Sequence, residues 1–455
     1  MITRLEIDGF KTFRDISLEV APFQILIGAG GAGKSNLFDA LVLLAHLANA
    51  DVRSAFQQSR GEPRELFTQF ADGNIAGRMR LAVEMLVPST VEDDWGATAD
   101  VKYTRMRYEV AIDRRMDDRG VERLYVAHEA LLPIQRSDDP WARRHIGRGR
   151  ERWLPPLKSG RTVPFLSTLT VEGVPTIYLH QDGRGGDRAA VAQSAERTVL
   201  STVSNTEFPH AFAARQEMRK WRVVDPCARA IRSSGSPLSH SYVASDGGNI
   251  PAALARIKAE SPYALERVAR DLVAVVPGVA GLDVSDGYMR EEPTIRLKRE
   301  DGHIISPGLL SGGALRMLAL VALKNDPDEG GAIFLEEPEN GLDNQSIRRA
   351  LPLLRGMSTD FERGDGEDEV LRQLLVATHS LELVRELVGL LGREEELPVH
   401  DLPEVLFVRA ERIAGEPVPT TTFSRIRPSQ QLELALDGAA EDYIHTLADL
   451  EGALD

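Results

Sequence analysis

The chain has 455 residues and a formal net charge of −15 at pH 7, so the molecule as a whole should repel nucleic acid. Hydrophobic residues make up 42% of it, which is enough for two or three units around sizeable cores. Its single cysteine, Cys227, excludes an internal disulfide and favours a reducing compartment. The longest apolar segment, residues 37–50, is interrupted by polar residues and is too short to cross a bilayer, and no signal segment precedes the first strand. We therefore expect a cytoplasmic location and no membrane partner.

The first informative motif is Gly28-Ala-Gly-Gly-Ala-Gly-Lys-Ser35, which fits the P-loop pattern G-x-x-x-x-G-K-[ST]. It follows an apolar run at 23–27 and precedes helical apolar spacing over 36–45, which is the strand, loop and helix that the motif requires. Glycines let backbone N–H groups turn toward phosphate oxygens, and the helix N-terminus adds positive dipole character. Lys34 is expected to reach the β- and γ-phosphates of ATP, and the Ser35 hydroxyl to bind Mg²⁺. The predicted nucleotide contacts in this segment are Gly28, Gly30, Gly31, Ala32, Gly33, Lys34, Ser35 and Asn36.

An acidic strand end appears much further along the chain. The apolar residues 332–335 run into Glu336-Glu337-Pro-Glu, which predicts a buried strand that carries carboxylates to the edge where open parallel sheets bind ligands. Glu336 is expected to hold Mg²⁺, directly or through water. Glu337 is expected to orient and polarise the attacking water, because γ-phosphate hydrolysis depends on positioning and charge stabilisation. Taken alone, either residue could equally be a solvated carboxylate.

Three further segments accompany the acidic strand end. Leu310-Ser311-Gly312-Gly313 precedes helical apolar spacing, and predicts either a second anion-binding helix end or an ordinary helix cap. Gly341-Leu342-Asp343 reads as a turn. Residues 374–377 predict another strand, which ends at Thr378-His379; a lone histidine in such a turn is often structural.

The order of these five motifs resembles the ABC-type ATPase head, within the soluble RecF- and SMC-related branch found in prokaryotic DNA-maintenance and phage-defence ATPases. Residues 1–13, the segment 33–41 and Glu336–Gly341 are typical of that branch. The resemblance covers the first ~50 residues and roughly 240–410. The chain departs from the family pattern at Gly30, where asparagine is common, and at Glu336, where aspartate is common; neither change excludes nucleotide binding.

The resemblance implies a composite site between two subunits that meet head to tail. Each ATP would lie between the P-loop of one subunit and Ser311, Gly312 and Gly313 of the other, in a homodimer that can assemble further. Asp343 would match the loop that couples the two sites, and His379 the switch histidine that bonds the γ-phosphate and acts with the catalytic Glu337. Mg²⁺ would be held by Ser35, Glu336 and a sensing glutamine. For that glutamine we predict Gln181, with Gln193, Gln57 and Gln58 as alternatives.

One stretch of the chain is rich in arginine although the net charge of the whole chain is negative. Arg143, Arg144, Arg148 and Arg150 alternate with Trp141 and Trp153, followed by Lys158 and Arg161. Arginines with interleaved aromatics can grip a phosphate backbone and stack on bases, which makes DNA a candidate partner. A solvated loop and a contact for an acidic protein surface are the alternatives.

These observations predict an α/β fold: an ABC-ATPase head with a P-loop sheet core, an accessory antiparallel sheet and a compact helical insertion. We expect a first ATPase lobe at 1–185, with the arginine-rich loop at about 136–165, and a helical insertion at 186–280. A second lobe at 281–455 carries the LSGG segment, the acidic strand end, the switch histidine and a C-terminal helix. No heptad pattern is sustained, so no long coiled coil is expected.

The predicted activity is Mg²⁺-dependent ATP hydrolysis that drives a dimerisation switch, as the resemblance implies. The switch would control a separate effector protein, such as a nuclease, or a DNA complex, in phage defence. Two alternatives stay open. One is an ATP-gated scaffold that inhibits an effector nuclease and hydrolyses ATP incidentally. The other is a RecF-like clamp in DNA repair.

Overall fold

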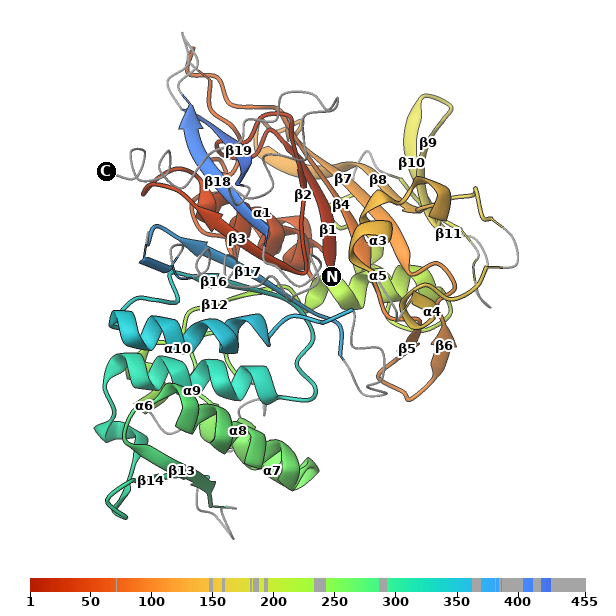
Figure 1. Cartoon of the computed structure of the whole chain (residues 1–455). Coiled ribbons are helices and arrows are strands. Elements are labelled where there is room, and N and C mark those ends of the chain that lie inside the picture. Colours follow the sequence, from red (N-terminus) through yellow and green to blue (C-terminus); the bar gives the residue numbers. More distant parts are fainter. Residues whose placement is uncertain are drawn as a thin grey trace, which may run out of the picture.

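The structure is a computed structural model, and its strands form sheets of eight, six, three and two strands (Figure 1). The residues that it describes are 1–70, 72–146, 150–157, 160–180, 182, 188–191, 195–232, 243–285, 293–361, 370–380, 382–383, 386, 404–411 and 419–426.

The six-stranded sheet carries the predicted nucleotide site. Its strands lie in the order β12-β16-β17-β3-β18-β19, and all neighbours pair in parallel except β18 with β19. Parallel pairing brings the carboxyl ends of β12, β16, β17 and β3 to one edge. The bounds are β12 Arg222–Val224, β16 Gly331–Glu336, β17 Arg372–Thr378, β3 Phe23–Ile27, β18 Glu404–Glu411 and β19 Thr420–Ile426.

This sheet is buried on both faces, as its near-continuous apolar strands require. Leu26 of β3 and Phe334 of β16 join one core, in which Phe334 stacks on Phe38 of α1 (Lys34–Leu47) with ring centroids 5.1 Å apart. Ile25 and Ile333 point to the opposite face and join a second core. Figure 1 shows α8, α9 and α10 layered on that second face. The second core is covered by α7 Ile250–Glu260, α8 Pro262–Val275, α9 Gly312–Asn325 and α10 Asn344–Arg355.

The eight-stranded sheet is antiparallel throughout and confirms the predicted accessory sheet. Its order is β11-β10-β9-β8-β7-β4-β1-β2. Its central strands β4 and β7 show the alternation of buried and more exposed residues typical of a sheet. The bounds are β1 Ile2–Asp8, β2 Ile16–Glu19, β4 Arg78–Leu86, β7 Arg105–Met116, β8 Glu122–Pro133, β9 Leu166–Val171, β10 Val174–Leu179 and β11 Arg188–Val191.

Shorter elements complete the described part of the chain. A β5–β6 hairpin projects beside the antiparallel sheet, and β13–β15 form a small sheet against α8. Within the described residues, no helix is long and apolar enough to cross a membrane. The remaining bounds are α2 Val52–Gln57, β5 Thr90–Glu92, β6 Thr98–Asp100, α3 Pro140–His145, α4 Arg150–Trp153, α5 Pro209–Arg219, α6 Ala228–Arg232, β13 Val279–Val284, β14 Ile295–Arg299 and β15 Ile304–Ile305, with single 3₁₀ turns at Arg136–Asp138, Leu200–Thr202 and Pro307–Leu309.

The helices and strands of residues 186–280, the predicted helical insertion, pack against different parts of the fold. α5 packs against α1, and β12 forms one edge of the six-stranded sheet, whereas α7 and α8 pack on α9. The sequence signal for helices came from α7 and α8, whose apolar residues recur at helical spacing. The division at 185 and 280 stays a prediction, and the expected C-terminal helix from about residue 438 lies outside the described residues.

The buried side-chain amide of Gln373 links the two large sheets. Gln373 of β17 is fully buried; its Oε1 accepts a hydrogen bond from the backbone N–H of Ile2 at 2.7 Å. Its Nε2 donates to the carbonyl oxygens of Ile2, at 2.6 Å, and Ala21, at 2.9 Å. All three partners are backbone groups at the start of β1 and after β2, so Gln373 fixes the antiparallel sheet against the strand that ends at the site.

Replacing this amide should destabilise the fold. Gln373→Ala leaves one buried N–H and two carbonyls without their partner and opens a small cavity, so the free energy of unfolding should fall by about 2–4 kcal/mol. Urea denaturation followed by circular dichroism measures the change. Gln345→Ala, at an exposed position of α10, is the matched control and should stay within about 0.5 kcal/mol of the parent. Equal midpoints for the two variants would contradict the role given to Gln373.

Candidate active site

The P-loop joins β3 to α1 and has the conformation that anion binding requires. Gly33 occupies the N-cap of α1 with φ +104°, and Gly31 has φ +78°, so both lie in the left-handed region that favours glycine. The first turn of α1 carries no acidic residue, and Ala29, Gly30 and Gly31 are exposed. The N-terminus of α1 therefore presents backbone N–H groups and positive dipole character to any phosphate placed over the loop.

Two of the P-loop glycines are also required by close packing. A Cβ added at Gly28 would lie 2.3 Å from the carbonyl oxygen of Val408, and one at Gly33 would lie 2.1 Å from Oγ1 of Thr421. Gly30, where the family pattern often has asparagine, faces open space instead. The departure at Gly30 thus changes no packing contact of the loop.

A hydrogen-bond network of hydroxyl and amide groups from three segments holds the P-loop in place. The buried Thr421 of β19 donates from Oγ1 to the carbonyl of Ala32 at 3.0 Å, and its Oγ1 lies 2.7 Å from that of Thr12. Nδ2 of Asn36 donates to Thr12 at 3.0 Å. Asn36 is therefore held away from the exposed loop by this network. Sequence analysis missed Thr12 and Thr421, because nothing in the chain links them to the P-loop before β19 is placed.

Lys34 is buried and turned onto the loop itself. Its Nζ donates to the carbonyl oxygens of Gly28 at 2.5 Å and Ala29 at 3.0 Å. Burial lowers the pKa of Lys34, and the negative charges of Glu337, Glu336 and Glu339 offset that effect only in part. A buried ammonium can exchange its hydrogen bonds to the two carbonyls for stronger, charge-assisted hydrogen bonds to the oxygens of a nucleotide phosphate.

The acidic strand end lies beside the P-loop. A cavity of about 240 Å³ is lined by Lys34 and Ser35 from α1 and by Glu336 and Glu337 from the end of β16. Glu337 has φ +47°, which is an unusual conformation for a residue with a side chain, and its backbone N–H donates to the carbonyl of Ala377 at 2.8 Å. The structure thus brings together the predicted phosphate-binding and acidic segments at one edge of the sheet.

His379 and Asn340 hold the carboxylate of Glu337. Nδ1 of His379 lies 2.7 Å from Oε1, and Nδ2 of Asn340 donates to Oε2 at 2.7 Å. Partial burial acts to raise the pKa of Glu337, but these two hydrogen bonds and the charges of His379 and Lys34 outweigh it, so the pKa lies below its ordinary value. Glu337 is consequently ionised at neutral pH and fixed in orientation.

Glu339 has the opposite electrostatic environment. It is buried, and burial raises its pKa above the ordinary value despite a hydrogen bond from the hydroxyl of Thr378. Its Oε2 has no partner in the described part of the chain. The two carboxyl groups, two residues apart, therefore differ: Glu337 is a charged group that lines the cavity, whereas Glu339 ties the end of β16 to the end of β17.

Two side chains of this cavity were missed by sequence analysis. Asp225 follows β12, and Arg316 projects from the second turn of α9; both line the cavity with Lys34 and Ser35. Val223-Val224-Asp225 has the same pattern of apolar strand and terminal carboxylate that identified Glu336. It went unnoticed because β12 has only three residues and lies between segments with helical spacing.

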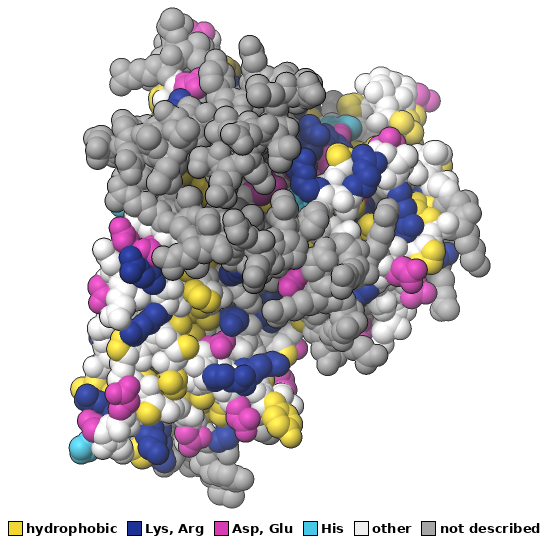
Figure 2. All heavy atoms as spheres, in the orientation of Figure 1, with side chains coloured by type: hydrophobic (Ala, Val, Ile, Leu, Met, Phe, Trp, Pro, Cys, Tyr) yellow, Lys and Arg dark blue, Asp and Glu magenta, His cyan; other side chains and the backbone are white. Residues whose placement is uncertain are grey.

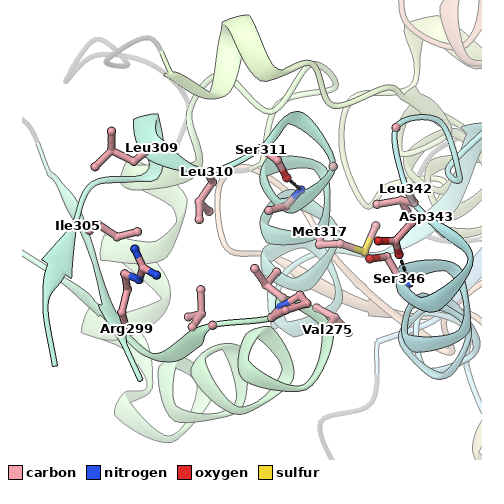
Figure 3. A pocket seen from close by; sticks show the side chains of 17 residues that line it. Val275, Arg299, Ile305, Leu309, Leu310, Ser311, Met317, Leu342, Asp343 and Ser346 are labelled. Carbon is pink, nitrogen blue, oxygen red and sulfur yellow. Dashed lines mark hydrogen bonds between the residues drawn. The ribbon is translucent and has the colours of Figure 1, made fainter. Parts of the chain in front are cut away.

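The predicted partner-facing residues line a second, larger cavity of about 380 Å³ (Figure 3). Ser311 caps α9, its Oγ accepting from the N–H of Ala314 at 3.2 Å, and Asp343 caps α10, its carboxylate accepting from the N–H of Ser346 at 2.7 Å. The hydrogen bond from Ser346 lowers the pKa of Asp343. A Cβ at Gly313 would lie 2.5 Å from the carbonyl of Gly341, so these two segments are tightly packed. Ser311, Gly312 and Asp343 are exposed.

Gln181 and the other glutamines lack support at this site. Gln181 and Gln193 lie outside the described residues. The strand before Gln181, β10, belongs to the antiparallel sheet, and its neighbour Asp182 is buried against His210, with Oδ2 and Nδ1 2.8 Å apart. Gln57 and Gln58 lie at the end of α2, which packs on α1 and on β8 of the antiparallel sheet. The sensing glutamine stays a prediction without a structural argument.

The arginine-rich stretch differs from the prediction in one respect: its tryptophans are not available for base stacking. Trp141 and Trp153 are 2% and 6% exposed and pack around Phe361 in a small core. Arg144 pairs with Glu19, with 2.5 Å between Nη1 and Oε1, and Arg143 donates to the carbonyl of Ser137 at 2.9 Å. Arg148 and Lys158 lie outside the described residues, as does the side chain of Arg150.

Basic residues elsewhere on the visible face do not form a single-sign patch. On the described part of the face drawn in Figure 2, lysine and arginine side chains are intermingled with carboxylates. On the antiparallel sheet, for example, Arg107 pairs with Glu6 at 2.7 Å and with Glu109 at 2.6 Å. The described part of this face therefore offers no continuous basic surface for DNA.

The donor set fits Mg²⁺ bound together with a nucleotide. Among the described residues, no three His, Cys, Asp or Glu side chains are grouped so as to hold a metal by themselves. Magnesium needs only one or two protein carboxylates or hydroxyls when phosphate oxygens and water supply the rest. Ser35 and Glu336, which line one cavity next to the P-loop, meet that requirement.

Comparison with family models agrees with this assembly. Residues 196–385, which contain the LSGG segment, the acidic strand end and His379, match the family described as "AAA domain, putative AbiEii toxin, Type IV TA system". Residues 1–59, which contain the P-loop, match "Protein of unknown function (DUF2813)". These two matches agree with the resemblance of the chain to the ABC-type P-loop ATPase head of the RecF- and SMC-like branch, whose five motifs lie around the P-loop sheet. No curated protein matches the chain.

The solved structures that match the chain include three SMC heads. The SmcHead bound to the C-winged helix domain of ScpA has 14% identity and a TM-score of 0.49, and the alignment covers 96% of this chain and 99% of that one. The SMC head domain from Thermotoga maritima has 13% identity, 94% and 99% coverage, and a TM-score of 0.38. The Smc head from Pyrococcus furiosus, bound to the C-terminal domain of ScpA, has 12% identity, 93% and 96% coverage, and a TM-score of 0.46.

The hydrogen bond from Asn340 predicts a change in pH dependence. Because the pKa of Glu337 is depressed, its carboxylate stays ionised at neutral pH and is protonated only as the pH falls through that lowered value. Asn340→Ala removes one of the groups that lower the pKa, so the acid limb of the kcat profile should move to higher pH, with kcat at pH 7 reduced about tenfold or less. Asn344→Ala, at an exposed position of α10, should leave the profile in place. Coincident acid limbs for the two variants would contradict this assignment.

Proposed function

We propose that the protein is a Mg²⁺-dependent ATP hydrolase. The observation that carries the proposal is the cavity lined jointly by Lys34, Ser35, Glu336 and Glu337 from two segments far apart in the chain. In the proposed reaction water attacks the γ-phosphorus, the bond to the ADP oxygen breaks, and ADP and phosphate leave. Bound Mg²⁺ would supply charge neutralisation of the phosphates.

The protein groups have distinct tasks in this reaction. P-loop N–H groups and Lys34 bind the phosphates, while Ser35 and Glu336 hold the metal. The carboxylate of Glu337, ionised because its pKa is depressed, accepts a hydrogen bond from the attacking water and so directs a lone pair toward phosphorus. His379 and Asn340 keep both oxygens of Glu337 in fixed positions, which reduces the entropy lost on reaching the transition state.

We further propose that ATP closes a head-to-tail dimer and that hydrolysis reopens it. This rests on two observations: Ser311, Gly312 and Asp343 are exposed, and Ser311 and Asp343 line a different cavity from Lys34. A second copy could bring the N-terminus of its α9 to the exposed P-loop, where the N-terminal dipole of that helix favours phosphate. Such a switch would control a separate effector protein, and the phage-defence setting proposed for it is the one that the resemblance implies.

Removing either the P-loop lysine or the water-directing carboxylate from the cavity should abolish ATP turnover. Lys34→Ala should weaken ATP binding strongly, because the buried cation that offsets phosphate charge is lost, whereas Glu337→Gln should bind ATP normally and hydrolyse it at least ~100-fold more slowly. Phosphate release in Mg²⁺-ATP measures turnover, and a fluorescent ATP analogue measures binding. Arg348→Ala, an exposed change on α10, should keep wild-type turnover. Hydrolysis that survives in both site variants would overturn the assignment as an ATPase.

Trapping the nucleotide should reveal the dimer. Glu337→Gln preserves the size of the side chain while removing the charge that activates water, so Mg²⁺-ATP should convert its light-scattering mass from monomer to dimer. Adding Ser311→Arg, which places a bulky cation on the proposed contact, should prevent the shift without changing the fold. Mg²⁺-ADP is the control and should leave the monomer. A monomer in every condition would reject the two-subunit mechanism.

A larger assembly that ignores ATP would have a different meaning. In that case the oligomer is formed by other surfaces, and ATP acts within it, as expected for a scaffold that restrains an effector. The family match to a toxin–antitoxin type of domain is the observation that keeps this second candidate open.

A further inference from the structure

The guanidinium of Arg316 connects three segments that end at the nucleotide cavity. Nη1 donates to the backbone carbonyls of Glu337 at 3.0 Å and Asn340 at 3.2 Å. Nε donates to the carbonyl of Pro226 at 3.3 Å, and Nη2 to Oδ1 of Asp225 at 3.1 Å. A planar guanidinium suits this arrangement, because its donors are fixed in one plane and cannot reorient independently.

The two carbonyls that accept from Nη1 belong to the turn that carries the water-directing carboxylate. Glu337 begins this turn with φ +47°, a backbone conformation that a residue with a Cβ adopts only when its surroundings impose it. Asn340 ends the turn, and its N–H donates to the carbonyl of Glu337 at 3.0 Å. Arg316 thus binds carbonyls at both ends of the turn, whereas the N–H of Glu337 binds Ala377 of β17.

Asp225 is the side-chain acceptor among the four groups that bind the guanidinium of Arg316. Its side chain is 64% exposed and lines the cavity, so its ion pair with the less exposed Arg316 contributes little to folding stability. The carboxylate instead fixes the direction of the guanidinium. Arg316 lies one turn and a half beyond Ser311, on the helix whose N-terminus is proposed to meet the partner's nucleotide.

We propose that Arg316 is a positioning residue for Glu337 and that Asp225 orients it, so that this pair transmits a displacement of α9 to the water-directing carboxylate. The proposal rests on the ATPase activity proposed above. It adds a mechanical connection between the Ser311 segment, which is proposed to meet the partner, and the cavity that contains Glu337. Contact at Ser311 moves α9, α9 carries Arg316, and the two carbonyl contacts carry the motion into the turn. Both residues line the nucleotide cavity, but the four hydrogen bonds of Arg316 go to the turn, to Pro226 and to Asp225, so the proposal assigns the pair to the position of Glu337 and not to nucleotide affinity.

Kinetics of single variants test the positioning role. Arg316→Ala should lower kcat about 10- to 100-fold while KM for ATP and the affinity for a fluorescent ATP analogue change less than about threefold. Arg316→Lys should recover only part of kcat, because an ammonium cannot reach the carbonyls and Asp225 together. Asp225→Ala should lower kcat about 3- to 10-fold, and Asp225→Asn, which keeps an acceptor oxygen, should lower it less.

A double-mutant cycle separates coupling from general destabilisation. If Asp225 acts only through Arg316, Arg316→Ala with Asp225→Ala should have the kcat of Arg316→Ala alone, rather than the product of the two losses. Thermal midpoints are measured for each variant, because a purely structural defect would lower the midpoint and reduce nucleotide binding and kcat in proportion. Arg348→Ala breaks a comparable exposed pair, Arg348–Glu386, and should match wild type.

Three results would overturn the inference. These are a kcat for Arg316→Ala within twofold of wild type, a loss of nucleotide affinity that accounts for the loss of turnover, and independent losses in the double variant. Wild-type protein without turnover would instead reject the proposed ATPase, and the positioning role would fall with it. The wild-type assay therefore distinguishes failure of the activity from failure of the pair.

Discussion

The parallel pairing of β12, β16, β17 and β3 is the constraint on which the site depends. Four strand ends meet at one edge: a carboxylate follows β12, carboxylates end β16, a histidine follows β17 and the P-loop follows β3. The sheet holds this register because both of its faces are buried, so a slip of one residue would turn apolar side chains to the wrong core. The geometry of the cavity follows from that burial.

The groups at this edge were predictable from sequence to the extent that their motifs are local. The P-loop, the acidic strand end and the capped helix at Ser311 each combine residue type, spacing and a flanking strand or helix, and the structure has those elements where the pattern indicates them. Their order along the chain also indicated the ABC-type head. Local pattern and tertiary fold agree here because apolar periodicity determines both.

Residues that depend on tertiary contacts could not be predicted in the same way. Thr421 supports the P-loop from β19, almost the whole length of the chain away, and Asp225 reaches the cavity only because the three-residue β12 pairs with β16. The tryptophans of the arginine-rich stretch show the converse. Their alternation with arginine has the composition of a nucleic-acid contact, yet Phe361 and neighbouring apolar groups bury them. Composition does not distinguish a stacking aromatic from a core anchor.

The polar contacts around Glu337 come from two parts of the fold, the edge of the six-stranded sheet and helix α9. Its side chain is held by His379 and Asn340, its N–H by Ala377, and its carbonyl by Arg316. Three of these groups belong to the sheet edge and its turn, which are fixed by the core, whereas Arg316 belongs to α9, whose first residues are exposed. A displacement that begins at Ser311 can therefore reach the carboxylate without disturbing the sheet. In the proposed mechanism, α9 links the cavity lined by Lys34, through Arg316, to the cavity lined by Ser311.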